Sequence, residues 1–224
     1  MPTAIITGAS RGLGQALTTA LAAAGWTVVI DGRTLSAEPA EPAEPAEPAG
    51  VVIRVPGDVT DPAHRAALVE AALGTGRLDL LVNNAGILGP SPQPPLADYP
   101  LATLRDVFEV NVVAPLALTQ LALPALRRHD GAVVTVTSDA AVEAYAGWGG
   151  YGAAKAAAEQ ASNVLAVEEP AVRVWWVDPG DLRTQMHAEA FPGEDISDRP
   201  LPETVTPAFV DLVTARPASG RVRL

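Results

Sequence analysis

The chain has 224 residues, 26 acidic against 15 basic side chains, a formal net charge of −11 and a pI near 4.6, and its length suits one domain, residues 1–224, with one sizeable core. The acidic balance argues against nucleic acid or an anionic membrane surface as a partner, because phosphate binding needs clustered basic side chains. With no cysteine and three scattered histidines, the sequence excludes disulfides and thiolate chemistry and argues against a metal site.

The first segment predicts a strand, a glycine turn and a helix. No basic leader precedes it and no apolar run approaches about 20 residues, so we expect a cytoplasmic protein with no membrane partner. The apolar run Ala4–Ile6 meets the glycine-rich stretch Thr7–Gly14, and apolar residues then recur at helical spacing up to Gly25. Glycines let a backbone approach a pyrophosphate at a helix N-terminus, but a tight strand-to-helix turn also needs them for packing, so the turn alone leaves both roles open.

The predicted second strand, Thr27–Ile30, ends in Asp31, Gly32 and Arg33. In a dinucleotide-binding fold this strand end lies beside the adenosine ribose, where a carboxylate favours a free 2′-hydroxyl and an arginine favours a 2′-phosphate. Asp31 and Arg33 therefore point to different cofactors. Arg11 in the glycine stretch adds a second cation, so the sequence favours NADP, with a solvated loop charge as the alternative reading of Arg33.

Four copies of Glu-Pro-Ala follow, over residues 38–49. A proline at every third position forbids an α-helix and favours polyproline II, whereas a crossover between parallel strands usually carries a helix. The simplest interpretation is a solvated tract that tolerates repeat expansion. The alternative hypothesis is that the tract, or another subunit, covers the sheet face that the missing helix would leave bare.

Two further strands are predicted at Val51–Val55 and Leu80–Val82. Asp58 follows the first of these, where an adenine ring would be contacted in a dinucleotide fold. The second runs into the stretch Asn83–Gly86, whose amide side chains suit either a tie between strands or a cofactor contact. A proline-rich loop over residues 89–100 comes next, near the expected ligand crevice.

Apolar residues at helical spacing predict a long helix over residues 101–128, interrupted by Asn111 and Pro115. Pro115 cannot donate to the Asn111 carbonyl, which would leave that carbonyl free to hold a water. An ordinary proline kink with Asn111 as a satisfied core amide is the alternative.

A fifth strand, Ala132–Thr137, ends at Ser138, and a helix beyond it carries Tyr151 and Lys155 four residues apart on one face. A phenol with a pKa of about 10 needs a neighbouring cation to act as a base near neutrality, and Lys155 could supply that charge. Tyrosine and lysine often share this spacing by chance, so the pair gains meaning only from the rest of the chain.

Six elements, in this order, resemble the signature of the short-chain dehydrogenase/reductase family: Thr7–Gly14, Asn83–Gly86, Asn111, Ser138, Tyr151 with Lys155, and Pro179-Gly180 followed by Thr184. The resemblance covers nearly the whole chain. It implies an α/β fold, a single-domain Rossmann-type doubly wound parallel sheet, in which the Glu-Pro-Ala tract replaces the helix between the second and third strands. It also implies a nicotinamide cofactor.

By the same resemblance, Ser138 would bind and polarise the substrate oxygen and Tyr151 would donate or accept the proton. Lys155 would hold the nicotinamide ribose and depress the tyrosine pKa, and Asn111 would anchor the water of a proton relay. The residues implied to bind the cofactor are Gly8, Ser10, Arg11, Leu13, Arg33, Asp58, Asn84, Tyr151, Lys155, Pro179, Gly180 and Thr184. Arg33, preceded by glycine and not by an acid, implies NADP, with NAD less favoured.

The leading interpretation is an NAD(P)-dependent oxidoreductase, acting by NADPH-dependent reduction of a small ketone or aldehyde or by the reverse oxidation. A cofactor-sensing or scaffold protein on this fold, or a redox-neutral epimerase or dehydratase, are the alternatives. Seven residues flank the predicted site and could line a substrate pocket: Leu88, Glu143, Tyr145, Trp148, Asp181, Met186 and His187. Small side chains on the helix of Tyr151 would allow a homo-oligomer, dimer or tetramer, to pair through the two long helices.

Overall fold

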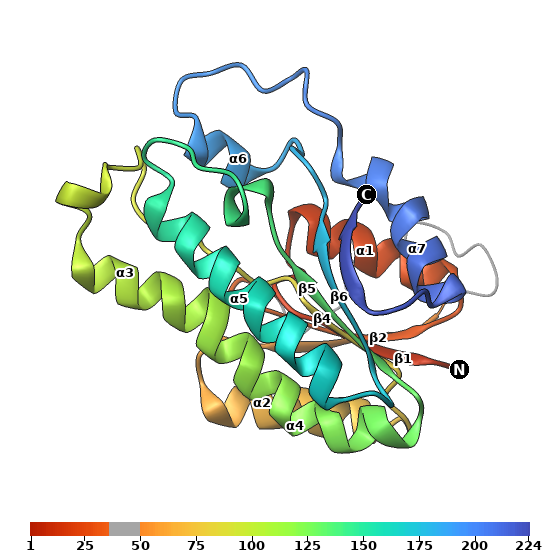
Figure 1. The fold of residues 1–224 in the computed structure, drawn as a ribbon. Coiled ribbons are helices and arrows are strands. Elements are labelled where there is room, and N and C mark those ends of the chain that lie inside the picture. The colour runs from red at the N-terminus through yellow and green to blue at the C-terminus, as the bar shows by residue number, and fades with distance from the viewer. Residues whose placement is uncertain (36–49) are drawn as a thin grey trace.

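The strands form one seven-stranded parallel sheet in the order β3-β2-β1-β4-β5-β6-β7 (Figure 1). The structure is a computed structural model that describes residues 1–35 and 50–224. The strands are β1 (Thr3–Ile6), β2 (Thr27–Gly32), β3 (Val52–Pro56), β4 (Leu80–Asn83), β5 (Ala132–Val136), β6 (Arg173–Asp178) and β7 (Gly220–Arg223). This topology confirms the predicted Rossmann-type, doubly wound sheet.

Helices cover both faces of the sheet (Figure 1). On one face lie α1 (Gly12–Ala23) and α7 (Thr206–Ala215), which contact each other, and on the other lie α2 (Pro62–Leu73), α4 (Ala114–Arg128) and α5 (Gly149–Glu168). Successive strand residues point to opposite faces, so each strand supplies both cores. Ile6 packs with Leu17 of α1, and its neighbour Ile5 packs with Leu68 of α2.

The long helix predicted over residues 101–128 is continuous but changes geometry at its centre. It consists of α3 (Leu101–Phe108), a π-helical turn (Glu109–Val113) and α4. The π turn stands where Pro115 cannot complete the ordinary hydrogen-bond ladder, which is a recognised cause of such bulges. By length and composition this helix could cross a membrane, but Leu118, Ala122 and Leu126 on its inner side are fully buried in the core beside β4 and β5.

The connection between β2 and β3 contains the Glu-Pro-Ala tract, which lies outside the described residues, so its polyproline II conformation and its contacts stay predictions. The smaller described elements are α6 (Gln185–Ala190) and 3₁₀ turns at Leu96–Asp98, Asp139–Ala141 and Pro202–Val205. The turn at Asp139–Ala141 and helix α6 both lie beside the crevice described next.

Candidate active site

A cavity of about 820 Å³ opens at the carboxyl ends of the strands. It spans the point between β1 and β4 where the strand order reverses, which is where open α/β sheets bind their ligands. All of the predicted cofactor residues line it, as do Ser138, Tyr151 and Lys155. Of the predicted substrate residues, Leu88, Trp148, Asp181, Met186 and His187 line it, whereas Glu143 and Tyr145 do not.

The glycine loop is shaped by backbone geometry that favours glycine. Gly8 and Gly12 have φ values of +66° and +58°, and a Cβ added to Gly8 would lie 2.8 Å from the Cα of Ala85. Asn84 ties this loop to the end of β4, because its Nδ2 donates to the carbonyls of Thr7 at 2.7 Å and Gly8 at 3.1 Å. Its side chain therefore has the strand-tying role and also lines the cavity.

Asp31 lines the cavity but is buried and hydrogen-bonded, so it is not the free carboxylate that the sequence interpretation considered. It is 1% exposed, and its Oδ1 accepts from the Gly8 amide at 2.6 Å while its Oδ2 lies 3.2 Å from Nε2 of His64. Burial raises the pKa of Asp31, and the Gly8 and His64 contacts oppose that rise. His64, which no sequence pattern singles out, thus helps hold the carboxylate beneath the glycine loop.

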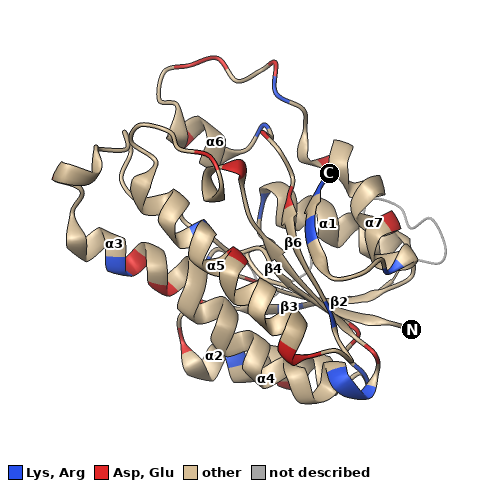
Figure 2. Cartoon of the chain, in the orientation of Figure 1, with Lys and Arg blue, Asp and Glu red and all other residues tan. Residues whose placement is uncertain are grey.

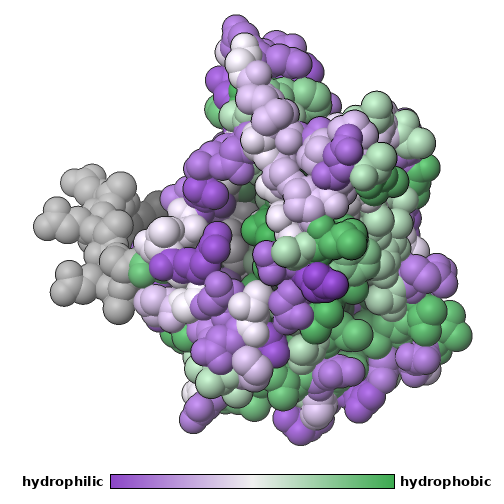
Figure 3. Space-filling view, turned by 90° about the vertical axis from the view of Figure 1, so that its left-hand side faces the viewer, coloured by the Kyte–Doolittle hydropathy of each residue, from purple (hydrophilic) through white to green (hydrophobic). Residues whose placement is uncertain are grey.

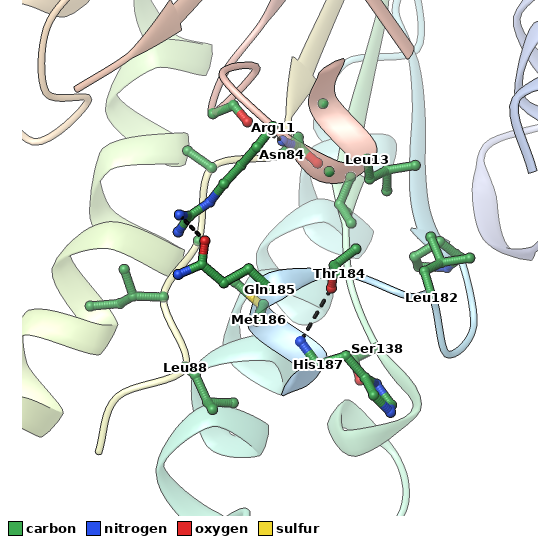
Figure 4. A pocket seen from close by; sticks show the side chains of 18 of the residues that line it. Arg11, Leu13, Asn84, Leu88, Ser138, Leu182, Thr184, Gln185, Met186 and His187 are labelled. Carbon is green, nitrogen blue, oxygen red and sulfur yellow. Dashed lines mark hydrogen bonds between the residues drawn. The ribbon is translucent and has the colours of Figure 1, made fainter. Parts of the chain in front are cut away.

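The cations that line this end of the cavity are Arg11 and Arg33. Asp58 lies close to Arg33 and accepts from the Thr60 amide at 2.9 Å and the Thr60 hydroxyl at 2.8 Å. The hydrogen bond from the Thr60 amide is the largest cause that lowers the pKa of Asp58, and Arg33 lowers it further. Arg11 reaches across the cavity and donates to Gln185 of α6 (Figure 4).

The side chains predicted to react come from the segment after β5, from α5 and from the π turn. Tyr151 and Lys155 lie on α5, where the Lys155 Nζ is 5.5 Å from the centre of the tyrosine ring and donates to the Val136 carbonyl at 2.9 Å. Asn111 lies behind the cavity wall and is not part of its lining. Its Oδ1 accepts from the Ile87 amide and its Nδ2 donates to the Ile87 carbonyl, both at 2.9 Å. Asn111 therefore fixes the loop after β4, as a satisfied core amide would.

The electrostatics around Tyr151 differ from the sequence expectation. Burial is the largest cause that raises the pKa of Tyr151, followed by the carboxylates of Asp139 and Asp178, so Lys155 alone does not depress it. Burial also lowers the pKa of Lys155 to about 8. The predicted depression of the Tyr151 pKa is therefore wrong, because burial removes the phenolate from water and two nearby carboxylates repel it. Tyr151 is consequently a protonated phenol at neutral pH.

Asp139 is a site residue that the sequence analysis missed. The Ser138 Oγ donates to its Oδ1 at 3.0 Å, and the Tyr145 hydroxyl donates to its Oδ2 at 3.1 Å. The Ser138 Oγ also accepts from the Ala140 amide at 3.2 Å, which caps the 3₁₀ turn. The place of Asp139 directly after Ser138 in the sequence was the signal that could have identified it.

A second missed feature is Arg221 on β7. Its Nε donates to Glu159 of α5 at 3.0 Å, and its second guanidinium nitrogen donates to Asp178 at 3.1 Å and to the Ser138 carbonyl at 3.3 Å. Thr137 also donates to Glu159, at 2.8 Å. The last strand thus ties together α5, the end of β6 and the segment that carries Ser138, through contacts between residues too far apart in sequence to be paired without the fold.

The glycine loop, the crevice at the strand-order reversal and the Ser138–Tyr151–Lys155 set define a nicotinamide-dependent oxidoreductase of Rossmann fold. The residues present fit such a cofactor, since the cavity holds two arginines and Asp58 at one end and a buried ammonium at the other.

Comparison with known proteins identifies the family. The short chain dehydrogenase model matches residues 2–195, and the chain belongs to that family. A 7α-hydroxysteroid dehydrogenase of Escherichia coli is 34% identical over 81% of this chain and 71% of the length of that dehydrogenase. A benzil reductase ((S)-benzoin forming) of Saccharomyces cerevisiae is 31% identical over 94% of this chain and 80% of the length of that reductase. A solved short chain dehydrogenase of Shigella flexneri complexed with NADP is 28% identical, covers 99% of this chain and 96% of its own, and superposes with a TM-score of 0.84.

Proposed function

We propose that this oxidoreductase uses NADPH to reduce a ketone or aldehyde of a small organic compound. The observation that carries the proposal is a buried phenol, Tyr151, that lies beside a buried ammonium and lines the same cavity as Ser138. A phenol whose pKa is raised holds its proton at neutral pH, so it is prepared to donate that proton to a carbonyl oxygen as it becomes an alkoxide.

When bound, the nicotinamide supplies the hydride. The chain's own residues do the rest. Ser138 turns its hydroxyl proton from Asp139 to the carbonyl oxygen, and Tyr151 donates its own proton to the same oxygen. Lys155 holds the nicotinamide ribose, and its charge favours the phenolate that proton transfer leaves behind. Asn111 acts indirectly, because its two hydrogen bonds to Ile87 hold the loop that forms one wall of the cavity.

Replacement of Tyr151 by phenylalanine tests the proposal. This change keeps the edge-on packing against Trp148, whose ring centre is 5.8 Å away, and removes only the proton donor. We expect turnover to fall by about 10³-fold or more while NADPH binding, measured by fluorescence titration, stays within about twofold. Normal turnover in this variant would exclude Tyr151 as the acid, and cofactor binding without turnover of a broad carbonyl panel by the wild type would favour a cofactor sensor.

NADPH is proposed over NADH because the one carboxylate at the end of β2, Asp31, is buried and already accepts two hydrogen bonds. Arg33 and Arg11, which line the cavity at this end, suit a 2′-phosphate. We expect Arg33→Ala to weaken NADPH binding by about 10-fold or more and NADH binding by less than about threefold. Equal losses for the two cofactors would contradict this specificity.

A further inference from the structure

The two ends of the cavity differ in the charge and the polarity of the side chains that line them. At the end formed by the glycine loop lie Arg11, Leu13 and Asn84, and in the same view Leu88, Ser138 and His187 lie toward the opposite end (Figure 4). Of the four arginines and lysines in the lining, Arg11 and Arg33 belong to the cofactor end and Lys155 adjoins Tyr151. The fourth, Arg183, directs its guanidinium to the carbonyls of residues 197 and 199.

The wall around the Tyr151 ring is apolar and rich in aromatic side chains. Tyr151 packs in a small cluster with Leu88 and Ala140, against which Trp148, Met186 and Ala190 also pack. Trp148 meets Phe191 at 5.7 Å between ring centres, and Phe191 lies 4.9 Å from the His187 ring. A ring or branched hydrocarbon body beside the reacting carbonyl would be well accommodated there.

This end of the cavity holds the Lys155 ammonium beside Tyr151 and two carboxylates, Asp139 and Asp181. Asp139 is one hydrogen bond from the Ser138 hydroxyl, so a carbonyl oxygen held by Ser138 would lie within about 6 Å of the Asp139 carboxylate. Asp181, 4.0 Å from Nδ1 of His187, also lines the cavity. Among the described residues the buried Nε2 of His187 has no hydrogen-bond partner, which leaves it available to a polar group of a ligand.

We infer that the substrate is an apolar, ring-bearing carbonyl compound that is neutral or cationic, and that Asp139 excludes carbonyl compounds with an anionic group near the reacting carbon. The inference rests on the proposed carbonyl reduction and names its substrate class. A carboxylate beside Asp139 would meet a like charge inside a partly desolvated cavity, where screening is weak. An ammonium at the same place would be attracted.

Three aryl methyl ketones that differ only in the meta group, which brings the charge closer to the reacting carbon than the para position does, test this inference with the NADPH-loaded enzyme: methyl, carboxylate and aminomethyl. We expect the wild type to reduce the carboxylate compound with a kcat/KM at least about 10-fold below that of the methyl compound, and the aminomethyl compound at least as well as the methyl one. Asp139→Asn should raise the carboxylate-to-methyl ratio by about 10-fold. Asp198→Asn, which removes an exposed acid that is not part of the cavity lining, should leave the ratio unchanged.

Binding of the same three compounds to the NADPH complex, followed by tryptophan fluorescence, separates this inference from the proposed reaction. If the three compounds bind with affinities that follow their charge but none is turned over, the result would contradict the carbonyl reduction and retain the inference. Two results would overturn the inference and retain the reaction. One is turnover with equal kcat/KM for the carboxylate and methyl compounds. The other is a carboxylate-to-methyl ratio of kcat/KM that is the same in the Asp139→Asn and Asp198→Asn variants.

Discussion

At the scale of the single residue, the charge state of Lys155 controls the site. Lys155 is only 5% exposed, and burial alone lowers its pKa from the ordinary value of 10.5 to about 8. A lysine with a lowered pKa keeps its charge below that pKa and loses it as the pH rises through it. Tyr151 has its pKa raised and stays protonated over the same range, so lysine is the group that titrates first.

The pH dependence of the reaction should reflect this order. We expect kcat/KM for carbonyl reduction to be level near neutrality and to fall with a slope of one proton above about pH 8, as Lys155 loses the charge that holds the ribose and supports the phenolate. The measurement is a kcat/KM profile from pH 6 to 10 in buffers of constant ionic strength. A profile that stays level to pH 10 would show that the ammonium remains charged in the working enzyme.

At the scale of the element, β7 is more than an edge strand, because Arg221 joins it to α5 and to the end of β6. Asp178 and Glu159 are 2% and 9% exposed, so without Arg221 they would be two buried carboxylates without a cation. We expect Arg221→Met to lower the free energy of unfolding by about 2 kcal/mol or more in urea titrations. Arg127→Met, which removes the exposed pair with Glu169, should cost less than about 1 kcal/mol.

Restoring the charge balance distinguishes this role from simple packing. The double variant Arg221→Met, Glu159→Gln should regain part of the lost stability, because it removes one of the two stranded carboxylates. If the double variant is less stable than the single one by the full cost of Glu159→Gln, the network contributes through packing and not through charge.

The sequence could predict the elements but only part of the site. Strands with continuous apolar runs, the glycine turn and the Tyr151–Lys155 spacing are local patterns, so the sheet and the catalytic helix follow from them. The burial of Asp31 and the pairing of Arg221 depend on contacts over 23 to 62 residues, which no local pattern encodes. The direction of the Tyr151 pKa depends on desolvation, which only the packed structure defines.

At the scale of the whole molecule, one flank is apolar. Five large apolar side chains are exposed on the π turn, α4 and α5: Val113, Leu116, Leu121, Val164 and Val167. No charged residue lies between Glu109 and Arg127 or between Glu159 and Glu168, and Figure 2 shows the same sparsity of charge along these helices. Figure 3 shows hydrophobic residues gathered along one side of the face that it presents. Contiguous exposed apolar patches are typical of interaction surfaces.

We propose that the partner is a second copy of this chain, paired through α4 and α5. A shallow groove between the two helices, lined by Leu116, Ala161 and Leu165, would let the helices of two copies approach closely. A two-fold arrangement is the commonest symmetry of soluble oligomers and places the same apolar patch on both sides of the interface.

Leu116→Glu tests this pairing, because it would place an unpaired carboxylate in the buried centre of the interface. We expect sedimentation equilibrium to show a wild-type dimer at micromolar concentration and a dimer Kd at least about 100-fold weaker in the variant. Leu201→Glu introduces the same charge at a comparably exposed leucine, 48% against 42%, away from these helices, and should leave the dimer intact. A monomeric wild type, or equal dissociation in both variants, would contradict an interface on this flank.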